Sequence, residues 1–261
     1  MPFKKIEAER VSDAITRQVE ALILRGVLRP GERLPSERDL ATKLGASRPS
    51  LREALADLED RGLIVTRPSA GAYVADVLGS AFSPPLIALF ASHEEALFDY
   101  LSFRRDLEGM AAERAARFAT PTDIQVIDEI FKRMEAAHSL RNPDQEAELD
   151  VEFHMAIVEA AHNVVMMHMM RSMFEMLKNG VFYNRRILFG VRDTRDILLD
   201  HHRAMHGAIL ARDPAAAKAA LEHHLNFIED SLREDLRRTA LEETAQLRHS
   251  QITKSTVVGR R

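Results

Sequence analysis

The sequence predicts a mainly α-helical protein with an N-terminal winged helix-turn-helix and a C-terminal bundle made of helices alone. Three observations predict this fold class. Residues 34–55 read as a helix, a tight turn and a second helix. Two short apolar runs follow, on either side of a turn at residues 68–71. Beyond residue 92, apolar residues recur with the period of a helix and no convincing strand pattern is found.

The first part begins with a predicted amphipathic helix over residues 11–27. Ser36 is placed to cap the next helix, and Gly45 ends it. Ser47 then caps a third helix, and Pro49 suits the first turn of that helix. A sharp turn between the last two helices lets the third one enter a major groove of DNA.

Arg48 and Arg52 are four residues apart and therefore share one face at the start of this third helix. Guanidinium groups match guanine edges and phosphates, so both residues suit the reading of DNA. The alternative is a solvated face in which Arg52 pairs with Asp39 or Glu53. Three helices followed by a hairpin favour the DNA-reading interpretation, because this order is that of a winged helix-turn-helix.

The second part contains six segments with helical periodicity, at about residues 93–119, 121–139, 143–161, 163–188, 194–211 and 214–247. Breaks between them include Pro121, Pro143, Gly190 and Pro214. We therefore expect a DNA-binding domain over residues 1–76, a linker over 77–92, a helical bundle over 93–247 and a disordered polar tail over 248–261.

Composition narrows the classes of function and of site. The chain of 261 residues has no cysteine, which excludes disulfides and thiolate metal sites. It shows no signal peptide and no apolar run of membrane-spanning length, so a cytoplasmic location without membrane contact is expected. Residues 1–76 carry 13 basic and 12 acidic side chains, so DNA affinity must depend on the placement of arginines and on dimerisation.

Three predicted helices of the bundle each place a histidine on an apolar stripe. Asp150 and His154 are four apart on one of them, His202 lies on a second and His224 on a third. Burying three imidazoles with a carboxylate is costly unless something pairs them, and a divalent metal is the simplest partner. This donor set suits Zn²⁺, and also Ni²⁺, Fe²⁺ or Mn²⁺.

The spacing alone leaves other histidine choices open. Of the 11 histidines, His201, His206 and His223 lie close to the same stripes, and His202 with His206 forms a metal pair four residues apart. Buried histidines that bind no metal are the alternative interpretation.

Residues 8–76 resemble the DNA-binding domain of GntR-family transcription regulators. The resemblance is carried by Pro30-Gly31, Leu34-Pro35-Ser36-Glu37, Ser47-Arg48, Leu51-Arg52-Glu53-Ala54-Leu55 and Gly62-Leu63-Ile64. It implies that Arg38, Arg48 and Arg52 contact the operator, with Ser47, Pro49 and Ser50 beside them and the wing tip near Gly71 in the minor groove. The wing departs from the family pattern, because residues 69–72 keep only the second of its two glycines.

Residues 93–232 resemble the FCD domain, the ligand-binding half of the FadR-like branch of this family. Its metal-binding members carry an aspartate and a histidine four apart on one helix and single histidines on two later helices. The resemblance therefore implies the set Asp150, His154, His202 and His224, and it leaves out His201, His206 and His223.

The same resemblance implies two residues that bind an effector. Arg104 lies in a segment similar to the family's VRxxLE and is implied as a clamp for a carboxylate. The alternative is that Arg104 or Arg105 is a surface residue paired with Glu108. Asn163 matches a recurrent asparagine of the family; alternatively, it caps the next helix.

These observations together predict a homodimeric transcription regulator that binds a palindromic operator and acts as a repressor. We do not expect it to be an enzyme. Its bundle is expected to bind a divalent metal and a small organic acid. One alternative is a metal-free regulator that responds to a fatty acyl thioester. A metal-dependent hydrolase is the other alternative, but the sequence shows no paired general base or nucleophile motif.

Overall fold

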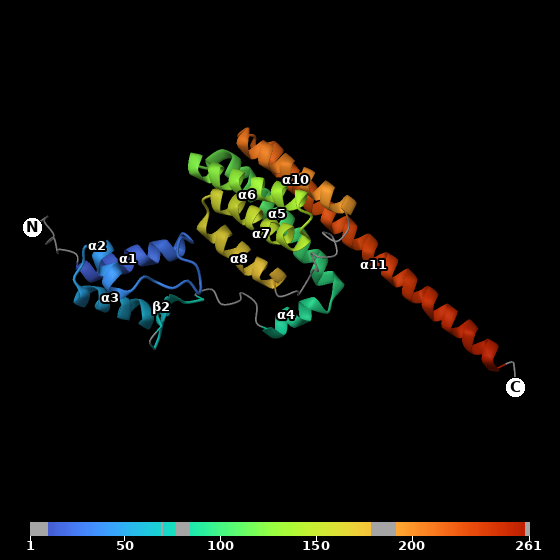
Figure 1. Ribbon diagram of the computed structural model, residues 1–261, viewed down its shortest axis with the longest axis horizontal. Helices are drawn as coiled ribbons and strands as arrows, with labels where there is room; N and C mark the ends of the chain where they lie inside the picture. Colours follow the sequence, from blue (N-terminus) through green and yellow to red (C-terminus); the bar gives the residue numbers. More distant parts are fainter. Residues whose placement is uncertain (1–9, 69, 77–83, 179–191, 259–261) are drawn as a thin grey trace, which may run out of the picture. The chain divides into compact units, whose positions relative to one another are not determined.

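The computed structural model describes residues 10–68, 70–76, 84–178 and 192–258, and it divides into two compact units (Figure 1). One unit contains the described residues up to Pro84 together with Met167–Glu175. The other contains Pro85–Met166 and the described residues from Met176 onward. Helices dominate both units, which confirms the mainly α-helical fold class.

The first unit contains three helices and a hairpin, as predicted for a winged helix-turn-helix. The helices are α1 (Val11–Leu24), α2 (Glu37–Leu44) and α3 (Arg48–Asp60), and the strands are β1 (Ile64–Arg67) and β2 (Gly71–Val74). The strands pair antiparallel, with Ile64 opposite Val74. The shared core consists of Ile15, Val19, Ile23, Leu34, Ala41, Leu51, Ala54, Leu58, Ile64 and Val74.

Local capping explains where the helices of this unit begin and end. Ser36 accepts a hydrogen bond from the Asp39 amide at 3.2 Å, and Ser47 accepts one from the Ser50 amide at 3.3 Å. Gly45 ends α2 in the left-handed region with φ 61°, which only glycine adopts at little cost. The helix expected over residues 11–27 ends earlier, at Leu24, ahead of Gly26 with φ 72°.

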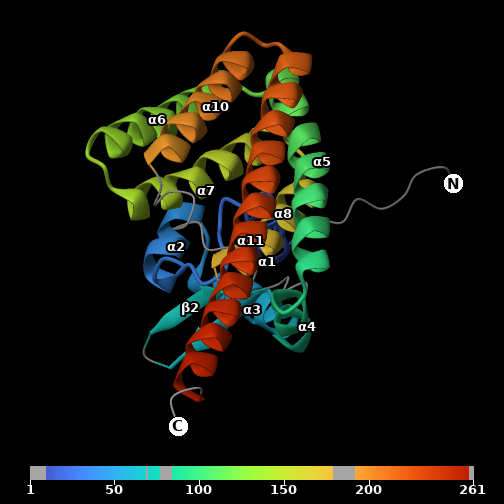
Figure 2. The ribbon, with the colours of Figure 1, turned by 90° about the vertical axis from the view of Figure 1, so that its right-hand side faces the viewer.

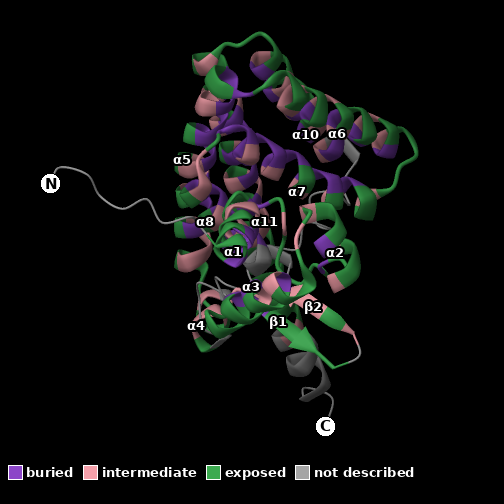
Figure 3. Cartoon of the chain, turned by 90° about the vertical axis from the view of Figure 1, so that its left-hand side faces the viewer, coloured by how far each residue is buried: buried purple, intermediate pink, exposed green. Residues whose placement is uncertain are grey.

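The second unit is a bundle built on α5 (Glu94–Phe118), α6 (Pro121–Ser139), α7 (Pro143–Ala160), α10 (Arg192–Leu210) and α11 (Pro214–Val258). Helix α11 packs against α5 and α10, while α7 packs against α5 and α6 (Figure 2). Figure 3 shows that buried residues gather on the inner faces of these helices. Helix α8 (Val164–Lys178) contributes residues to both units.

Proline starts and side-chain caps begin the helices of the bundle where the sequence predicts. Thr120 and Asp123 form a reciprocal capping box ahead of α6. Asn142 caps α7 by accepting from the Gln145 amide, and Asp213 caps α11 by accepting from the Ala216 amide. Each cap satisfies an amide that has no partner inside its own helix.

Two segments differ from the expected organisation. The predicted linker contains a short helix, α4 (Pro84–Ala91), which begins at a proline and consists of apolar residues. Residues 248–258, where the sequence led us to expect disorder, continue α11, because neither glycine nor proline interrupts the helix before Gly259. The predicted break at Gly190 and residues 179–188 of a predicted helix lie outside the described residues.

None of the described helices is long and apolar enough to span a membrane.

Candidate functional site

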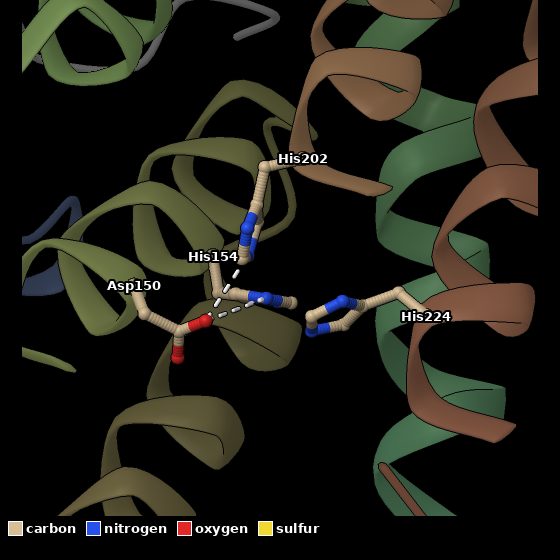
Figure 4. A group of neighbouring side chains, drawn as sticks. All are labelled: Asp150, His154, His202 and His224. Atoms are coloured by element: carbon tan, nitrogen blue, oxygen red, sulfur yellow. Dashed lines mark ion pairs between the residues drawn. The ribbon is translucent and has the colours of Figure 1, made fainter. Parts of the chain in front are cut away.

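Asp150, His154, His202 and His224 converge at one point inside the bundle (Figure 4). Asp150 and His154 come from α7, one turn apart, while His202 comes from α10 and His224 from α11. One potential ligand atom from each residue lies within 4.8 Å of the others. All four residues are buried, so the cluster is enclosed by the bundle.

Several ring nitrogens in this cluster lack a hydrogen-bond partner. Nε2 of His154 and both nitrogens of His224 are buried without one. His202 Nε2 lies 3.0 Å from an Asp150 oxygen, and His154 Nε2 lies 3.8 Å from the same oxygen. Buried polar groups are normally paired, so each of the unpaired nitrogens points to a missing partner.

A metal ion fits this donor set. Zinc binds imidazole nitrogen and carboxylate oxygen at about 2.0–2.2 Å, which places tetrahedral ligands roughly 3.3 Å from one another. The spacing of up to 4.8 Å in the cluster needs only small side-chain rotations to reach that arrangement. Three imidazoles and one carboxylate can therefore hold a divalent cation with zinc-like preferences.

Burial keeps two of the histidines, His202 and His224, in the form that binds a metal. Burial lowers the pKa of His202, although Asp150 opposes this effect. Burial also lowers the pKa of His224 well below its usual value, and the neighbouring imidazoles His202 and His154 lower it further. Both rings are therefore neutral near pH 7, and neutral imidazole is the ligand form.

Glu108, which the sequence analysis did not select as a binding residue, connects the cluster to Arg104. Oε1 of Glu108 accepts from Arg104 Nε at 2.6 Å, and Oε2 accepts from His154 Nδ1. Burial alone would raise the pKa of Glu108, but Arg104 and His154 lower it to about 2. The signal in the sequence was a glutamate on the buried stripe of α5, four residues after an arginine.

Arg104 and Arg105 differ sharply in their surroundings. Arg104 is 2% exposed and faces the interior, whereas Arg105 lies nearer the surface, with its Nη1 2.9 Å from Asn226 and 3.4 Å from Glu229. The alternative that Arg104 is a surface residue does not hold, although its pairing with Glu108 does. Arg104 therefore stands beside the cluster with its charge offset by a carboxylate.

A small pocket of about 10 Å³ lies between α6, α7 and α10, and His202 is one of its lining residues. Its other lining residues are Met134, His138, Glu146, Arg195 and Leu199. Arg195 Nε bonds Glu146 at 3.0 Å, and both side chains are buried. This second buried arginine near the cluster was also missed, because helical spacing does not show which partner a charged residue meets.

The remaining candidates from the sequence do not belong to the group of four, although the ring of His201 lies 5.9 Å from that of His224. His206 stacks on Phe131, and its Nε2 lies 3.1 Å from an Asp128 oxygen. His223 is exposed and meets the ring of His201 edge-on. Asn163 accepts from the Met166 amide at 3.1 Å, which is the capping contact expected in the alternative interpretation.

The DNA-facing candidates lie on the surface of the first unit. The side chains of Arg38, Arg48 and Arg52 are 85%, 60% and 63% exposed. Oε2 of Glu37 lies 3.7 Å from Nη2 of Arg48 and 2.8 Å from Nε of Arg52. Arg52 therefore pairs with Glu37 and not with Asp39 or Glu53, the partners that the sequence suggested. Exposed pairs of this kind are weak and leave the guanidinium groups available.

Of the other DNA-facing candidates, Ser47 and Pro49 are exposed and Ser50 is partly exposed. Gly71 is exposed at the start of β2 with φ 97°. Arg67, which the sequence analysis missed, ends β1 opposite Gly71, and its guanidinium group stacks over the ring of Tyr73.

Comparison with known proteins identifies the family. Residues 11–74 match the family of bacterial regulatory proteins named gntR, and residues 99–227 match the FCD domain. The chain is 36% identical over 249 residues to the "Putative L-lactate dehydrogenase operon regulatory protein" of Escherichia coli (strain K12), covering 94% of this chain and 92% of the relative. The chain belongs to the GntR family of bacterial regulatory proteins. It is a DNA-binding transcription regulator with an FCD domain.

Further relatives agree with the assignment of this chain to the family. The chain is 34% identical over 232 residues to the "Glc operon transcriptional activator" of Escherichia coli (strain K12), covering 87% of this chain and 91% of the relative. It is 30% identical over 212 residues to the "HTH-type transcriptional regulator LutR" of Bacillus subtilis (strain 168), covering 81% and 96%. The solved structure of Streptococcus agalactiae GntR shares its fold, with a TM-score of 0.51 and 24% identity over 83% of this chain and 98% of the other.

Proposed function

We propose that this regulator controls transcription in response to a small organic acid, through a divalent metal held by Asp150, His154, His202 and His224. The observation that carries the proposal is that three buried histidines each bring one ring nitrogen within 4.8 Å of the others and of an Asp150 oxygen, while Nε2 of His154 and both nitrogens of His224 have no hydrogen-bond partner. Leaving a buried polar group unpaired costs about 1–3 kcal/mol, and a metal held at this point would take one nitrogen from each ring. Zinc is the first metal to test, because it prefers nitrogen and oxygen donors in this number.

The charges around the cluster indicate the charge of the effector. Arg104 and Glu108 offset each other, as do Arg195 and Glu146, and Asp150 leaves one negative charge. A divalent ion would make the site positive by one, which a monocarboxylate neutralises. A bound metal would supply open coordination positions for a carboxylate or hydroxyl oxygen.

We assign Arg104 as the clamp for that carboxylate. It is buried on α5 beside the cluster, and guanidinium groups bind carboxylates with two parallel hydrogen bonds. The name of the Escherichia coli relative includes L-lactate dehydrogenase, so L-lactate is the first acid to test. Asn163 is kept as a weaker effector candidate, since its side chain already caps α8.

On the DNA side, we propose that Arg38, Arg48 and Arg52 read a palindromic operator with Ser47, Pro49, Ser50 and the wing tip at Gly71. A palindrome needs two winged units, so the regulator is proposed to act as a homodimer and, in the absence of the effector, as a repressor. This arrangement compensates for the nearly balanced charge of residues 1–76.

Elemental analysis of the purified full chain tests the metal. The wild type should carry about one divalent ion per chain, and the His154→Ala, His224→Ala double variant should carry almost none. His223→Ala is the matched control, because His223 neighbours His224 in sequence but is exposed.

Calorimetric titration of the metal-loaded chain with L-lactate tests the acid. Arg104→Ala should lose most of the heat of binding.

Equal metal content in the wild type and the double variant would overturn the metal centre. The metal-free regulator that responds to an acyl thioester would then replace it.

A further inference from the structure

The two carboxylate oxygens of Glu108 contact two different residues of the proposed site, the effector clamp Arg104 and the metal ligand His154. Oε1 accepts from Arg104 Nε, and Oε2 accepts from Nδ1 of His154, 46 residues further along the chain. Glu108 is 0% exposed, so solvent does not compete for either oxygen. The contact is therefore a fixed feature of the interface between α5 and α7.

This contact fixes where His154 carries its proton. An ionised carboxylate only accepts hydrogen bonds, and the neighbouring guanidinium keeps Glu108 ionised. Nδ1 of a neutral His154 must therefore be the protonated nitrogen, and Nε2 must carry the lone pair. That Nε2 is the His154 nitrogen that faces the cluster, 3.8 Å from Asp150 and without a hydrogen-bond partner.

We infer that Glu108 is a positioning residue that sets the tautomer of His154 and so presents its Nε2 lone pair to the metal. The inference rests on the proposed function and assigns Glu108 a role outside the ligand set. Among the described residues, neither His202 nor His224 has a carboxylate from outside the proposed ligand set paired with a ring nitrogen. His154 is thus the ligand that an outer carboxylate orients before a metal arrives, and such outer contacts normally orient metal-bound histidines.

Glu108→Gln tests this role because it changes one atom and reverses the hydrogen-bonding pattern. Arg104 can only donate, so it takes the single amide oxygen of the glutamine. The amide nitrogen then faces His154 Nδ1, which must become an acceptor. The proton moves to Nε2 and occupies the lone pair that the metal needs. Asp106→Asn, an exposed change on the same helix, is the matched control.

The first measurement is the tautomer of His154 in the metal-free full chain, from ¹⁵N NMR of histidine-labelled protein. The spectrum of His154→Ala identifies its signals among the 11 histidines. We expect the Nδ1-protonated form in the wild type and in Asp106→Asn, and the Nε2-protonated form in Glu108→Gln. An Nε2-protonated His154 in the wild type would overturn the inference without any reliance on a variant.

The second measurement is zinc affinity, by competition with a chromophoric chelator. Glu108→Gln should bind zinc about 10–100-fold more weakly than the wild type, as is usual for the loss of an outer-shell partner. Asp106→Asn should match the wild type. Unchanged affinity in Glu108→Gln beside a zinc-binding wild type would overturn only the role of Glu108. A wild type that binds no zinc would overturn the metal centre itself.

Discussion

Replacing His224 by leucine should change the stability of the regulator in opposite directions with and without metal. His224 is 0% exposed on α11, and both of its ring nitrogens are buried without a hydrogen-bond partner. Each unpaired buried polar group costs about 1–3 kcal/mol. Leucine fills a similar volume and has no polar atom. In the metal-free protein, His224→Leu should therefore raise the free energy of unfolding by roughly 1–3 kcal/mol.

With metal present the sign should reverse. A ligand that binds only the folded state stabilises it by about 4.1 kcal/mol when its concentration is 1,000 times its Kd, which exceeds the gain of roughly 1–3 kcal/mol expected without metal. His224→Leu removes one of the four candidate ligands and should forfeit most of this stabilisation. The same substitution should therefore be stabilising in chelator and destabilising in zinc.

Urea unfolding of the full chain in EDTA and in excess zinc measures both effects. His206→Leu is the matched control, because His206 lies on α10 with its Nε2 3.1 Å from Asp128 and its ring stacked on Phe131. This control should lose stability equally in both conditions. If His224→Leu also lost the same stability in EDTA and in zinc, His224 would be an ordinary packing residue and the argument from unpaired nitrogens would fail.

Three further predictions concern DNA binding and pH. Arg48→Ala or Arg52→Ala should each weaken specific operator binding by about 1–3 kcal/mol, and an unchanged gel-shift titration at fixed salt would refute their role as base-reading residues. The isolated fragment of residues 1–76 should lose most of the affinity of the full chain for its operator; equal half-site binding would contradict the dimer. Acidification should destabilise the metal-free protein, because burial depresses the pKa of His202 and His224, so the unfolded chain binds more protons. The stability is present above the unfolded pKa of about 6.5 and is lost as pH falls below it, and His224→Leu should reduce the fall in Tm between pH ~7.5 and ~5.5.

The sequence by itself determined the elements of the fold and the faces they bury. Caps such as Ser36, Ser47 and Thr120 act on amides within a few residues, so their positions can be read directly from the chain. Apolar periodicity is equally local, and it placed Asp150, His154, His202 and His224 on inward stripes. The family resemblance then selected these residues, and the structure brings the same four together.

The tertiary structure alone decided what each inward polar residue meets. Helical spacing shows which face a side chain lies on, but the partner comes from another helix at a distance along the chain that no local rule fixes. Glu108 therefore remained a possible surface partner in the sequence, while packing of α5 against α7 joins it to His154. The packing of α10 beside α7 and α6 likewise paired Arg195 with Glu146 of α7 and gave His206 the carboxylate of Asp128 on α6 as its partner. The tertiary structure left both ring nitrogens of His224 unpaired, because burial removes water and, among the described residues, no neighbouring helix supplies them with a hydrogen-bonding group.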